Sequence, residues 1–291
     1  MTSSAGTSGY ATANEPPILT LTTDFGLRDG YVAAMKGVIL SLCPTARIVD
    51  VTHEIAPQAV AEAVFITSTA WPYFPPGAIH VCVVDPGVGT ERKAVLLLTE
   101  AGRFIGPDNG ALSAALPEAL RASASPGGGP VALAGATGVE AFSIENPSYL
   151  SPVVSPTFHG RDVFAPAVAH LALGAPPETF GPRVEAVVAL PPFRARKDAS
   201  GALRGRIIHV DRFGNLITNV RGDDIPAGSV IVRVGGREVK GPVPTFAAGE
   251  GLLAFVGSYG YLAVALRDGS AASALGVGVG AEIAVRRAPM D

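Results

Sequence analysis

IHVCVV, residues 79–84, points to the fold class more directly than any other segment of this chain. The run is mostly apolar and ends at Asp85, where a Gly-rich turn, DPGVGTER, continues to Arg92. A continuous apolar run of this length suits a buried strand, and open α/β sheets place ligand sites at the carboxyl ends of such strands. The segment therefore predicts a parallel sheet with a candidate site where the strand ends.

Similar strands alternate with helical patterns along the first half of the chain. We expect Asp29 to cap the first helix, because its side chain can accept hydrogen bonds from the N–H groups of the first turn, and Pro44 to end it. The predicted strands cover residues 18–22, 47–51, 79–84 and 94–98, and the predicted helices follow Asp29 and span residues 60–71 and 162–173. Continuous apolar strands in this β-α-β-α-β order predict an α/β domain with a mostly parallel sheet flanked by helices.

The second half has a different pattern. Residues 122–130 are predicted as a surface loop, and residues 174–197, with five prolines and no strong periodicity, as a linker. Short β runs separated by turn residues follow at 207–210, 216–220, 230–234, 252–256, 261–266 and 282–285. This spacing is typical of a small antiparallel sandwich or barrel. We expect a disordered tail at residues 1–17, an α/β N-terminal domain at 18–190 and a β-barrel-like C-terminal domain at 191–291.

Composition narrows the classes of partner. The 291 residues carry a net charge of -3, which argues against nucleic acid or an acidic membrane surface as the main partner. The sequence contains no stretch of about 18 apolar residues free of charge, Gly or Pro, so no membrane span is predicted. The first 17 residues lack the basic and apolar regions of a signal peptide. Cys43 and Cys82 lie in apolar surroundings and are expected to be buried thiols, so we expect a cytoplasmic protein.

Polar residues gather at the predicted strand ends. Asp85 and Arg92, seven residues apart, could position and polarise a water molecule together with the imidazole of His159 on another turn. The alternative is purely structural, a strand-end turn with a surface ion pair. The full set of strand-end candidates is Asp24, Asp85, Asp108, Asn109, His159, Asp211, Asn215 and Ser258. Taken singly, several of these also fit an Asx turn, a tight turn or a hairpin bracket.

Other chemistries have weaker sequence support. Asp24, Asp85, His53 and His159 are acceptable metal ligands, but no close pair has a ligand spacing such as His-x-x-x-His or Cys-x-x-Cys. A metal site stays open as an alternative, although His53 is explained more simply as a turn histidine. The glycines of residues 87–89 lack the third glycine of a dinucleotide-binding fingerprint. Neither a phosphate-binding loop nor a Gly-x-Ser-x-Gly elbow occurs in the chain.

Six motifs in one order carry a family resemblance. They are TDFG (23–26), VDPGVGTER (84–92), PDNG (107–110), PTFHGRD (156–162), FGN (213–215) and GSYGYL (257–262). Together they resemble the S-adenosylmethionine hydroxide adenosyltransferases, which are related to the fluorinase and the chlorinase. The resemblance covers about residues 18–287, which is nearly everything except the tail.

The resemblance implies an N-terminal α/β domain, a C-terminal β-barrel-like domain and a homotrimer. Each active site would lie between one chain's N-terminal domain and a neighbour's C-terminal domain. The implied reaction is S-adenosylmethionine plus water giving adenosine and L-methionine. Because the methionine thioether leaves as a neutral group, the reaction needs no general acid, and no metal or redox cofactor follows from this scheme.

Residue roles are implied motif by motif. The water-activating triad is Asp85, Arg92 and His159. The implied substrate contacts are Asp24 for the ribose hydroxyls, Asp211 for the methionine amine, Ser258 for its carboxylate, Asn215 for adenine, and Phe158, Phe213 and Phe246 for the apolar walls.

The halogenating relatives define the competing reaction. In the fluorinase a tyrosine stands at the position matching Asp85, a serine that contacts fluoride matches Gly160, and an extra loop follows the position of Arg92. A carboxylate would repel a halide, so Asp85 favours water, whereas Gly160 is ambiguous because the chlorinase also has glycine there. Asp211 lies one residue closer to Asn215 than in the fluorinase, which leaves its position open.

Two alternatives to hydrolysis remain from the sequence. One is a halide-using adenosyltransferase, and the other is a sensor that binds S-adenosylmethionine or a nucleoside without turnover. The complete set of Asp85, Arg92 and His159 favours the hydrolase over both.

Overall fold

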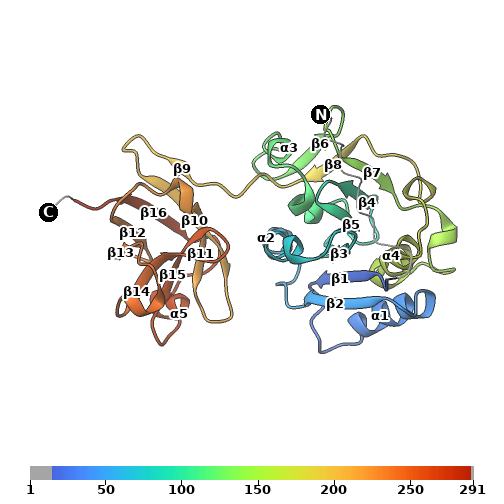
Figure 1. The fold of residues 1–291 in the computed structure, drawn as a ribbon, viewed down its shortest axis with the longest axis horizontal. Coiled ribbons are helices and arrows are strands. Elements are labelled where there is room, and N and C mark those ends of the chain that lie inside the picture. The colour runs from blue at the N-terminus through green and yellow to red at the C-terminus, as the bar shows by residue number, and fades with distance from the viewer. Residues whose placement is uncertain (1–14, 290–291) are drawn as a thin grey trace, which may run out of the picture. The chain divides into compact units, whose positions relative to one another are not determined.

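The computed structural model describes residues 15–289 (Figure 1). The predicted disordered tail, residues 1–17, therefore falls almost entirely outside the described residues. The chain divides into two compact units between Pro192 and Phe193.

A mixed six-stranded sheet forms the centre of the first unit. Its strand order is β2-β1-β3-β5-β4-β7, in which the first three pairings are parallel and β4 runs antiparallel to both of its neighbours. The strands are β1 (Ile18–Thr23), β2 (Arg47–Thr52), β3 (Ile79–Val83), β4 (Ala94–Thr99), β5 (Gly102–Pro107), β6 (Gly129–Ala132), β7 (Glu140–Ser143) and β8 (Ala186–Ala189). The helices are α1 (Tyr31–Leu42), α2 (Val60–Ala70), α3 (Glu118–Arg121) and α4 (Ala165–Ala172), with a π-helical turn, η4 (Gly160–Phe164), leading into α4. The predicted α/β class is confirmed.

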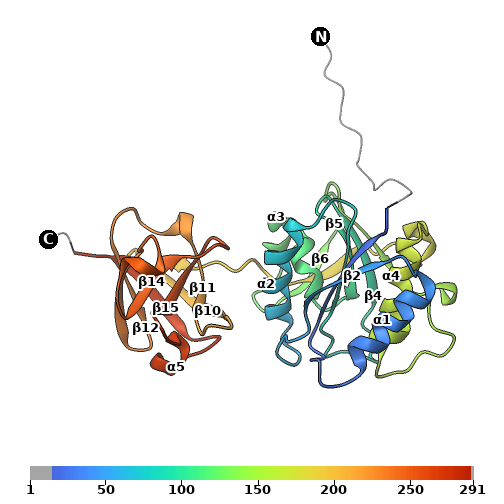
Figure 2. The ribbon, with the colours of Figure 1, turned by 60° about the horizontal axis from the view of Figure 1, so that its bottom comes forward.

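Helices cover both faces of this sheet (Figure 2). On one face α1 and α4 pack against each other and against β1 and β3, where Leu21 and Val81 are buried. On the other face α2 and the 3-10 turn Ala111–Ala115 cover Cys82 and Val84. Successive residues of β3 thus enter two different cores, which explains why the segment is apolar without alternation.

Several elements differ from the sequence prediction. β6 begins within the predicted loop, and the predicted linker contains β8 and β9; β6 and β8 pair antiparallel as a separate two-stranded sheet. In β5 the Gly and Pro residues obscured a short apolar centre, and Gly106 is needed because a side chain there would overlap the Cys82 carbonyl oxygen. The predicted Asp29 cap is wrong, since α1 has Gly30 at its N-cap and makes no side-chain capping bond.

The second unit is an antiparallel sheet that nearly closes on itself. The strand order is β13-β12-β16-β10-β11-β15-β14, with β9 pairing to β10, and the Val243 N–H donates to the Ala254 carbonyl (2.8 Å) across the gap between β13 and β14. The elements are β9 (Arg196–Lys197), β10 (Leu203–Val210), β11 (Leu216–Arg221), β12 (Val230–Val234), β13 (Arg237–Gly241), β14 (Leu252–Val256), β15 (Tyr261–Leu266), α5 (Ala271–Leu275) and β16 (Glu282–Arg287). Its core is aliphatic and includes Val232, Val264 and Val285. The prediction of a barrel-like all-β unit is confirmed, although β9, β13 and α5 were not predicted.

Two further expectations concern the thiols and the membrane. Cys43 and Cys82 are both buried and free, as predicted, and burial raises the pKa of Cys82 to about 12. Among residues 15–289, the helices are too short or too polar to traverse a bilayer.

Candidate active site

Neighbouring parallel strands bring the first site residues together. Asp24 follows β1 directly, and Asp85 follows β3 after one further residue. Because β1 and β3 are paired in parallel, with Thr23 opposite Val83, both carboxylates emerge at the same edge of the sheet. The apolar run that ends at Asp85 therefore brings its carboxylate to the same edge of the sheet as Asp24.

Arg92 joins Asp85 to His159. Its Nε atom donates to both carboxylate oxygens of Asp85, at 3.0 Å each, and its Nη2 atom also donates to Oδ2. The same Nη2 lies 2.7 Å from Nδ1 of His159, 67 residues away in the sequence. The Asp85 and Arg92 side chains are only 5% and 10% exposed, so this is not the surface ion pair of the structural alternative.

The contact with Arg92 determines the protonation of His159. A guanidinium has only donors, so Nδ1 of His159 must accept and the ring proton must sit on Nε2. The pKa of His159 is lowered, first by burial and then by the Arg92 charge, against the opposing pull of Asp85 and Asp162. The imidazole is therefore neutral near pH 7, with its Nε2–H left to donate.

Glycines allow the loop that carries Asp85 and Arg92 to approach the loop that carries His159. Gly89 has φ +77°, and a side chain there would overlap the Pro156 carbonyl oxygen. Contact between these loops brings the Arg92 segment to the start of η4, where His159 is the N-cap residue. Gly160 is also enclosed, because an added Cβ would lie 3.1 Å from the nearest atoms of Met35 and Phe25.

Asp24 is held by a strained neighbour. The backbone N–H of Gln58 donates to Asp24 Oδ2 at 2.8 Å, and Gln58 adopts φ 66°, a left-handed conformation that is unfavourable for a side chain of this kind. Beside Asp24, the hydroxyl of Thr23 meets Nδ1 of the buried His53 at 2.9 Å. His53 thus supports the β1 turn, as the structural explanation held.

Three aromatic rings form a cluster beside these polar groups. Phe158 meets the rings of Phe25 at 5.9 Å and Tyr31 at 5.1 Å, both edge-on, and Tyr31 is 49% exposed. Phe25 and Tyr31 were not among the predicted site residues. The position of Phe25 next to Asp24 and of Tyr31 at the start of α1 was the signal that could have identified them.

In the second unit Asp211 and Asn215 form one turn. Asp211 Oδ1 accepts from the backbone N–H groups of Phe213 and Asn215, both at 2.9 Å, and Oδ2 accepts from the Asn215 amide at 2.7 Å. These bonds fit the hairpin bracket considered from the sequence. They also orient the Asn215 side chain and leave Phe213 projecting, 75% exposed.

Ser258 lies at the other end of the same strands. The Asp211 turn borders α5, where the Ala272 N–H donates to the Gly214 carbonyl, whereas the Ser258 turn borders Gly222 beyond the far end of β11. Leu216 pairs with Val264 and Arg221 with Tyr261, so β11 bulges between its two ends, and these ends lie only three residues of β15, or roughly 10 Å, apart. The remaining predicted contact of the second unit, Phe246, is 48% exposed, and its ring centroid lies 4.6 Å from that of Phe255.

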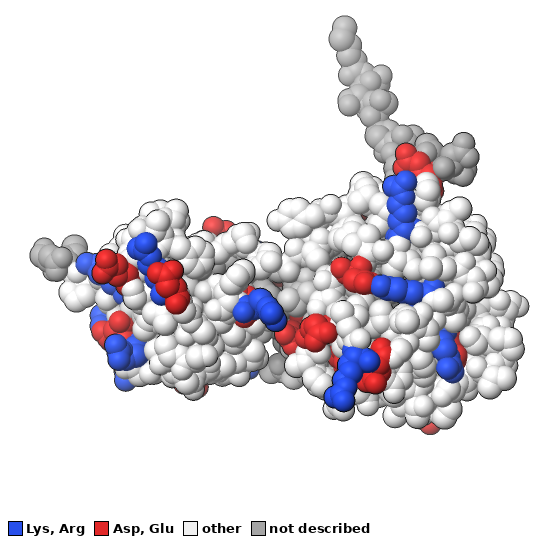
Figure 3. Space-filling model, turned by 90° about the horizontal axis from the view of Figure 1, so that it is seen from below, with Lys and Arg blue, Asp and Glu red and all other residues white. Residues whose placement is uncertain are grey.

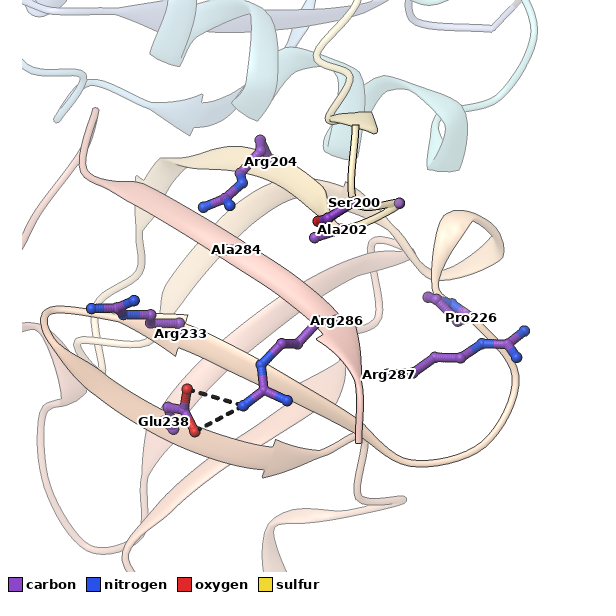
Figure 4. A pocket seen from close by; sticks show the side chains of 10 residues that line it. Ser200, Ala202, Arg204, Pro226, Arg233, Glu238, Ala284, Arg286 and Arg287 are labelled. Carbon is purple, nitrogen blue, oxygen red and sulfur yellow. Dashed lines mark hydrogen bonds and ion pairs between the residues drawn. The ribbon is translucent and has the colours of Figure 1, made fainter. Parts of the chain in front are cut away.

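Other surfaces of the described residues offer less. No group of three or more His, Cys, Asp or Glu side chains within residues 15–289 is arranged to hold a metal ion. Figure 3 shows basic and acidic side chains interspersed on one face. A hollow of about 600 Å³ on the second unit is rich in arginine, but Arg286 is paired with Glu238 (Figure 4). Arg204, which also lines it, is paired with Asp198. None of the predicted site residues lines it.

Comparison with known proteins accords with this geometry. The family model for the SAM hydroxide adenosyltransferase N-terminal domain matches residues 19–181, and that for the C-terminal domain matches residues 205–284. The chain is 41% identical over 273 residues to the (R)-S-adenosyl-L-methionine hydrolase of Salinispora arenicola, covering 92% of this chain and 97% of the relative. It is 30% identical over 311 residues to the fluorinase of Nocardia brasiliensis, covering 93% and 97% of the two chains.

A solved structure shares the fold. An uncharacterized conserved protein from Thermotoga maritima superposes with a TM-score of 0.79 at 35% identity, covering 93% of this chain and all of the other. The two family models together span most of the chain, and the loops that carry Asp85, Arg92 and His159 fall within the first. The chain therefore belongs to the SAM hydroxide adenosyltransferase family.

Proposed function

We propose that this protein hydrolyses S-adenosyl-L-methionine to adenosine and L-methionine. The observation that carries the proposal is the buried contact of Arg92 with both Asp85 and His159, in a chain whose relatives at 36–42% identity are named (R)-S-adenosyl-L-methionine hydrolase. The name specifies the (R) configuration at sulfur, so the (R) epimer is the first substrate to test.

The chemical difficulty lies in the nucleophile. The sulfonium carries its own leaving group, a neutral thioether, whereas forming hydroxide from bulk water at pH 7 costs about 12 kcal/mol. Arg92 is permanently cationic and stabilises the developing hydroxide. Attack at ribose C5′ then depends on holding the water in line with the departing sulfur.

The hydrogen bonds of the triad support a separate role for each side chain. Nδ1 of His159 accepts from Arg92 and Nε2 carries the ring proton, so His159 orients the water as a donor rather than taking its proton. Asp85 is the proton acceptor, because Oδ1 accepts only from Nε of Arg92 and keeps a lone pair, whereas Oδ2 already accepts from both Nε and Nη2. This assignment is narrower than the one from the sequence, in which either Asp85 or His159 could accept the proton of the water.

Asp24 is suited to hold the ribose. Oδ2 of Asp24 is fixed by the Gln58 N–H, and a carboxylate can accept hydrogen bonds from two neighbouring hydroxyls at once. The edge-on rings of Phe25, Tyr31 and Phe158 would supply an apolar, electron-rich wall that favours a sulfonium cation. Asn215, Ser258, Phe213 and Phe246 would provide the remaining contacts from a second unit.

The proposed assembly is a homotrimer in the cytoplasm with sites shared between subunits. Exposed apolar side chains beside both sets of site residues support it, because such surfaces commonly mark interaction sites. These are Leu27, Tyr31 and Val153 in the first unit, and Phe213, Phe246 and Tyr259 in the second.

Mass spectrometry of a single incubation tests the proposal. Purified protein is treated with a chelator, mixed with either sulfonium epimer of S-adenosylmethionine, and sampled with and without fluoride or chloride. We expect adenosine and methionine in equal amounts, no halogenated nucleoside, and no dependence on added metal. Bound but unchanged ligand would support the sensor, a halogenated nucleoside the halide-using transferase, and rescue by one divalent ion a metal enzyme.

A further inference from the structure

Asn109 bonds directly to the backbone beside Asp85. Its Nδ2 atom donates to the Val84 carbonyl oxygen at 2.9 Å, and its Oδ1 atom accepts from the Ala111 N–H at 3.0 Å. The Val84 carbonyl belongs to the same rigid peptide plane as the nitrogen of Asp85. Fixing that carbonyl therefore fixes the direction of the Asp85 N–Cα bond and restricts the direction in which the Asp85 side chain leaves the backbone.

The neighbouring residue holds the other end of the same loop. The Asp108 N–H donates to the Lys93 carbonyl oxygen at 2.9 Å, immediately after Arg92. Asp108 is itself fixed, because its Oδ1 accepts from the Val188 N–H of β8 at 2.7 Å. One segment at the end of β5 thus clamps both ends of the loop that carries Asp85 and Arg92.

We propose that Asn109 is a positioning residue that sets the Asp85 carboxylate against Arg92 and His159. The proposal rests on the hydrolysis proposed above, since it assigns Asn109 a part in that reaction. Asn109 acts through Asp85 and needs no contact with substrate. Because a misplacement of about 1 Å can reduce a rate by about 10²-fold, one lost hydrogen bond at this carbonyl has an effect on turnover far beyond its effect on folding.

The variant Asn109→Asp tests the hydrogen bond from Asn109 to the Val84 carbonyl by itself. The new carboxylate has the same shape and still accepts from the Ala111 N–H, but it places an oxygen without a proton against the Val84 carbonyl. We expect kcat to fall by about tenfold or more, with KM changed by less than about twofold. An unchanged kcat in a folded variant overturns the proposal.

The chain contains a matched control. Asn146 makes the same two bonds elsewhere, donating to the Thr179 carbonyl at 2.8 Å and accepting from the Ser148 N–H at 3.0 Å. Asn146→Asp should lose comparable stability and keep the wild-type kcat. Equal losses of kcat in both variants would show a general folding effect and would also overturn the proposal.

A pH series provides the rescue. A protonated carboxyl at position 109 can again donate to the Val84 carbonyl, whereas the carboxylate cannot. The ratio of variant kcat to wild-type kcat should therefore rise as pH falls toward the carboxyl range. A ratio that stays flat or falls contradicts the clamp.

A second readout separates this inference from the proposed function. If the wild-type protein releases no adenosine, the hydrolase assignment fails, but the ring nitrogen resonances of His159 still report its contact with Arg92 in both asparagine variants. Asn109→Asp should shift the Nδ1 resonance and Asn146→Asp should not. The reverse pattern, or no shift in either variant, overturns the positioning role independently of turnover.

Discussion

Arg92 Nη2 lies 2.7 Å from His159 Nδ1, while the same guanidinium donates to both oxygens of Asp85. One planar group therefore sets the carboxylate and the imidazole relative to each other. The three side chains come from two loops, so this alignment exists only in the folded protein. It also means that a change at Arg92 disturbs both partners together.

Replacing Arg92 by lysine should nearly abolish turnover. An ammonium group keeps the charge, but its flexible stem lacks the planar fork that meets Asp85 and His159 together. We expect kcat to fall by about 10²-fold, in the range typical of lost general acid–base groups, with a small change in KM. Arg204→Lys serves as the control, because it alters an exposed pair with Asp198. A wild-type kcat in Arg92→Lys would show that the planar guanidinium is not needed for turnover.

His159 should be a neutral Nε2–H tautomer that resists protonation. Long-range proton–nitrogen spectra at pH 7 should show an unprotonated Nδ1 and a protonated Nε2. Because burial and the Arg92 charge lower its pKa, kcat should persist as pH falls through the ordinary histidine range near 6.5 and decline only below it. Arg92→Met should raise the pKa of His159, and detection of an Nδ1–H tautomer in the wild type would contradict the assignment.

The lowered pKa of His159 also predicts a pH dependence of folding stability. Below about pH 6.5 the unfolded chain binds a proton at His159 that the folded chain does not, so stability is lost as pH falls toward the folded pKa. Above that range there is no effect. The free energy of unfolding should therefore drop more between pH 8 and pH 5.5 in the wild type than in His159→Gln. An equal drop in both proteins would contradict the lowered pKa.

Gly89→Ala should separate the two catalytic loops. A methyl group there overlaps the Pro156 carbonyl oxygen, and the left-handed backbone adds about 1–2 kcal/mol of strain. Gly135→Ala is the matched control, because Gly135 has φ +78° but nothing within 4 Å of the added methyl. Both variants should lose stability in denaturant titrations, and only Gly89→Ala should also lose kcat by about tenfold or more. Equal kcat in the two variants would show that loop contact does not matter for turnover.

Parts of this architecture could be read from the sequence because they are local. β3 and β4 are mostly apolar runs without alternation and are largely buried on both faces of the sheet, so pattern and environment agree. The strand-end position of Asp85 follows from the same pattern. β5 and β6 escaped prediction because glycine and proline, which normally mark turns, lie within them.

The contacts of the site depend on distances that a pattern does not contain. Arg92 meets His159 across 67 residues only because Gly89 lets its loop touch the segment before His159. The sequence suggested that Asp211 either stabilises a hairpin turn or contacts the methionine amine. Its carboxylate bonds to Phe213 and Asn215 show the turn-stabilising role directly. Asn109 looked like an ordinary turn residue, because the Val84 carbonyl it holds is 25 residues away.

Mixed subunits test where each site is completed. Asp85→Ala disables the first unit of a chain, and Asn215→Ala disables the second unit by removing the side chain that Asp211 orients. Each variant alone should be inactive. If a site combines the first unit of one chain with the second unit of its neighbour in a closed ring, co-expressed chains form some interfaces with two intact halves. Random assembly makes that true of about a quarter of the sites, so the mixture should recover about a quarter of wild-type activity.

The control is a mixture of the two inactive proteins under conditions where subunits do not exchange, which should stay inactive. Sedimentation of the co-expressed sample, purified through a different tag on each chain, should show a trimer that contains both variants. If each site were instead built within one chain, every site would carry one lesion. A mixed trimer without activity would therefore indicate that each site is completed by the second unit of the same chain. A fully active monomer would contradict the shared-site assembly.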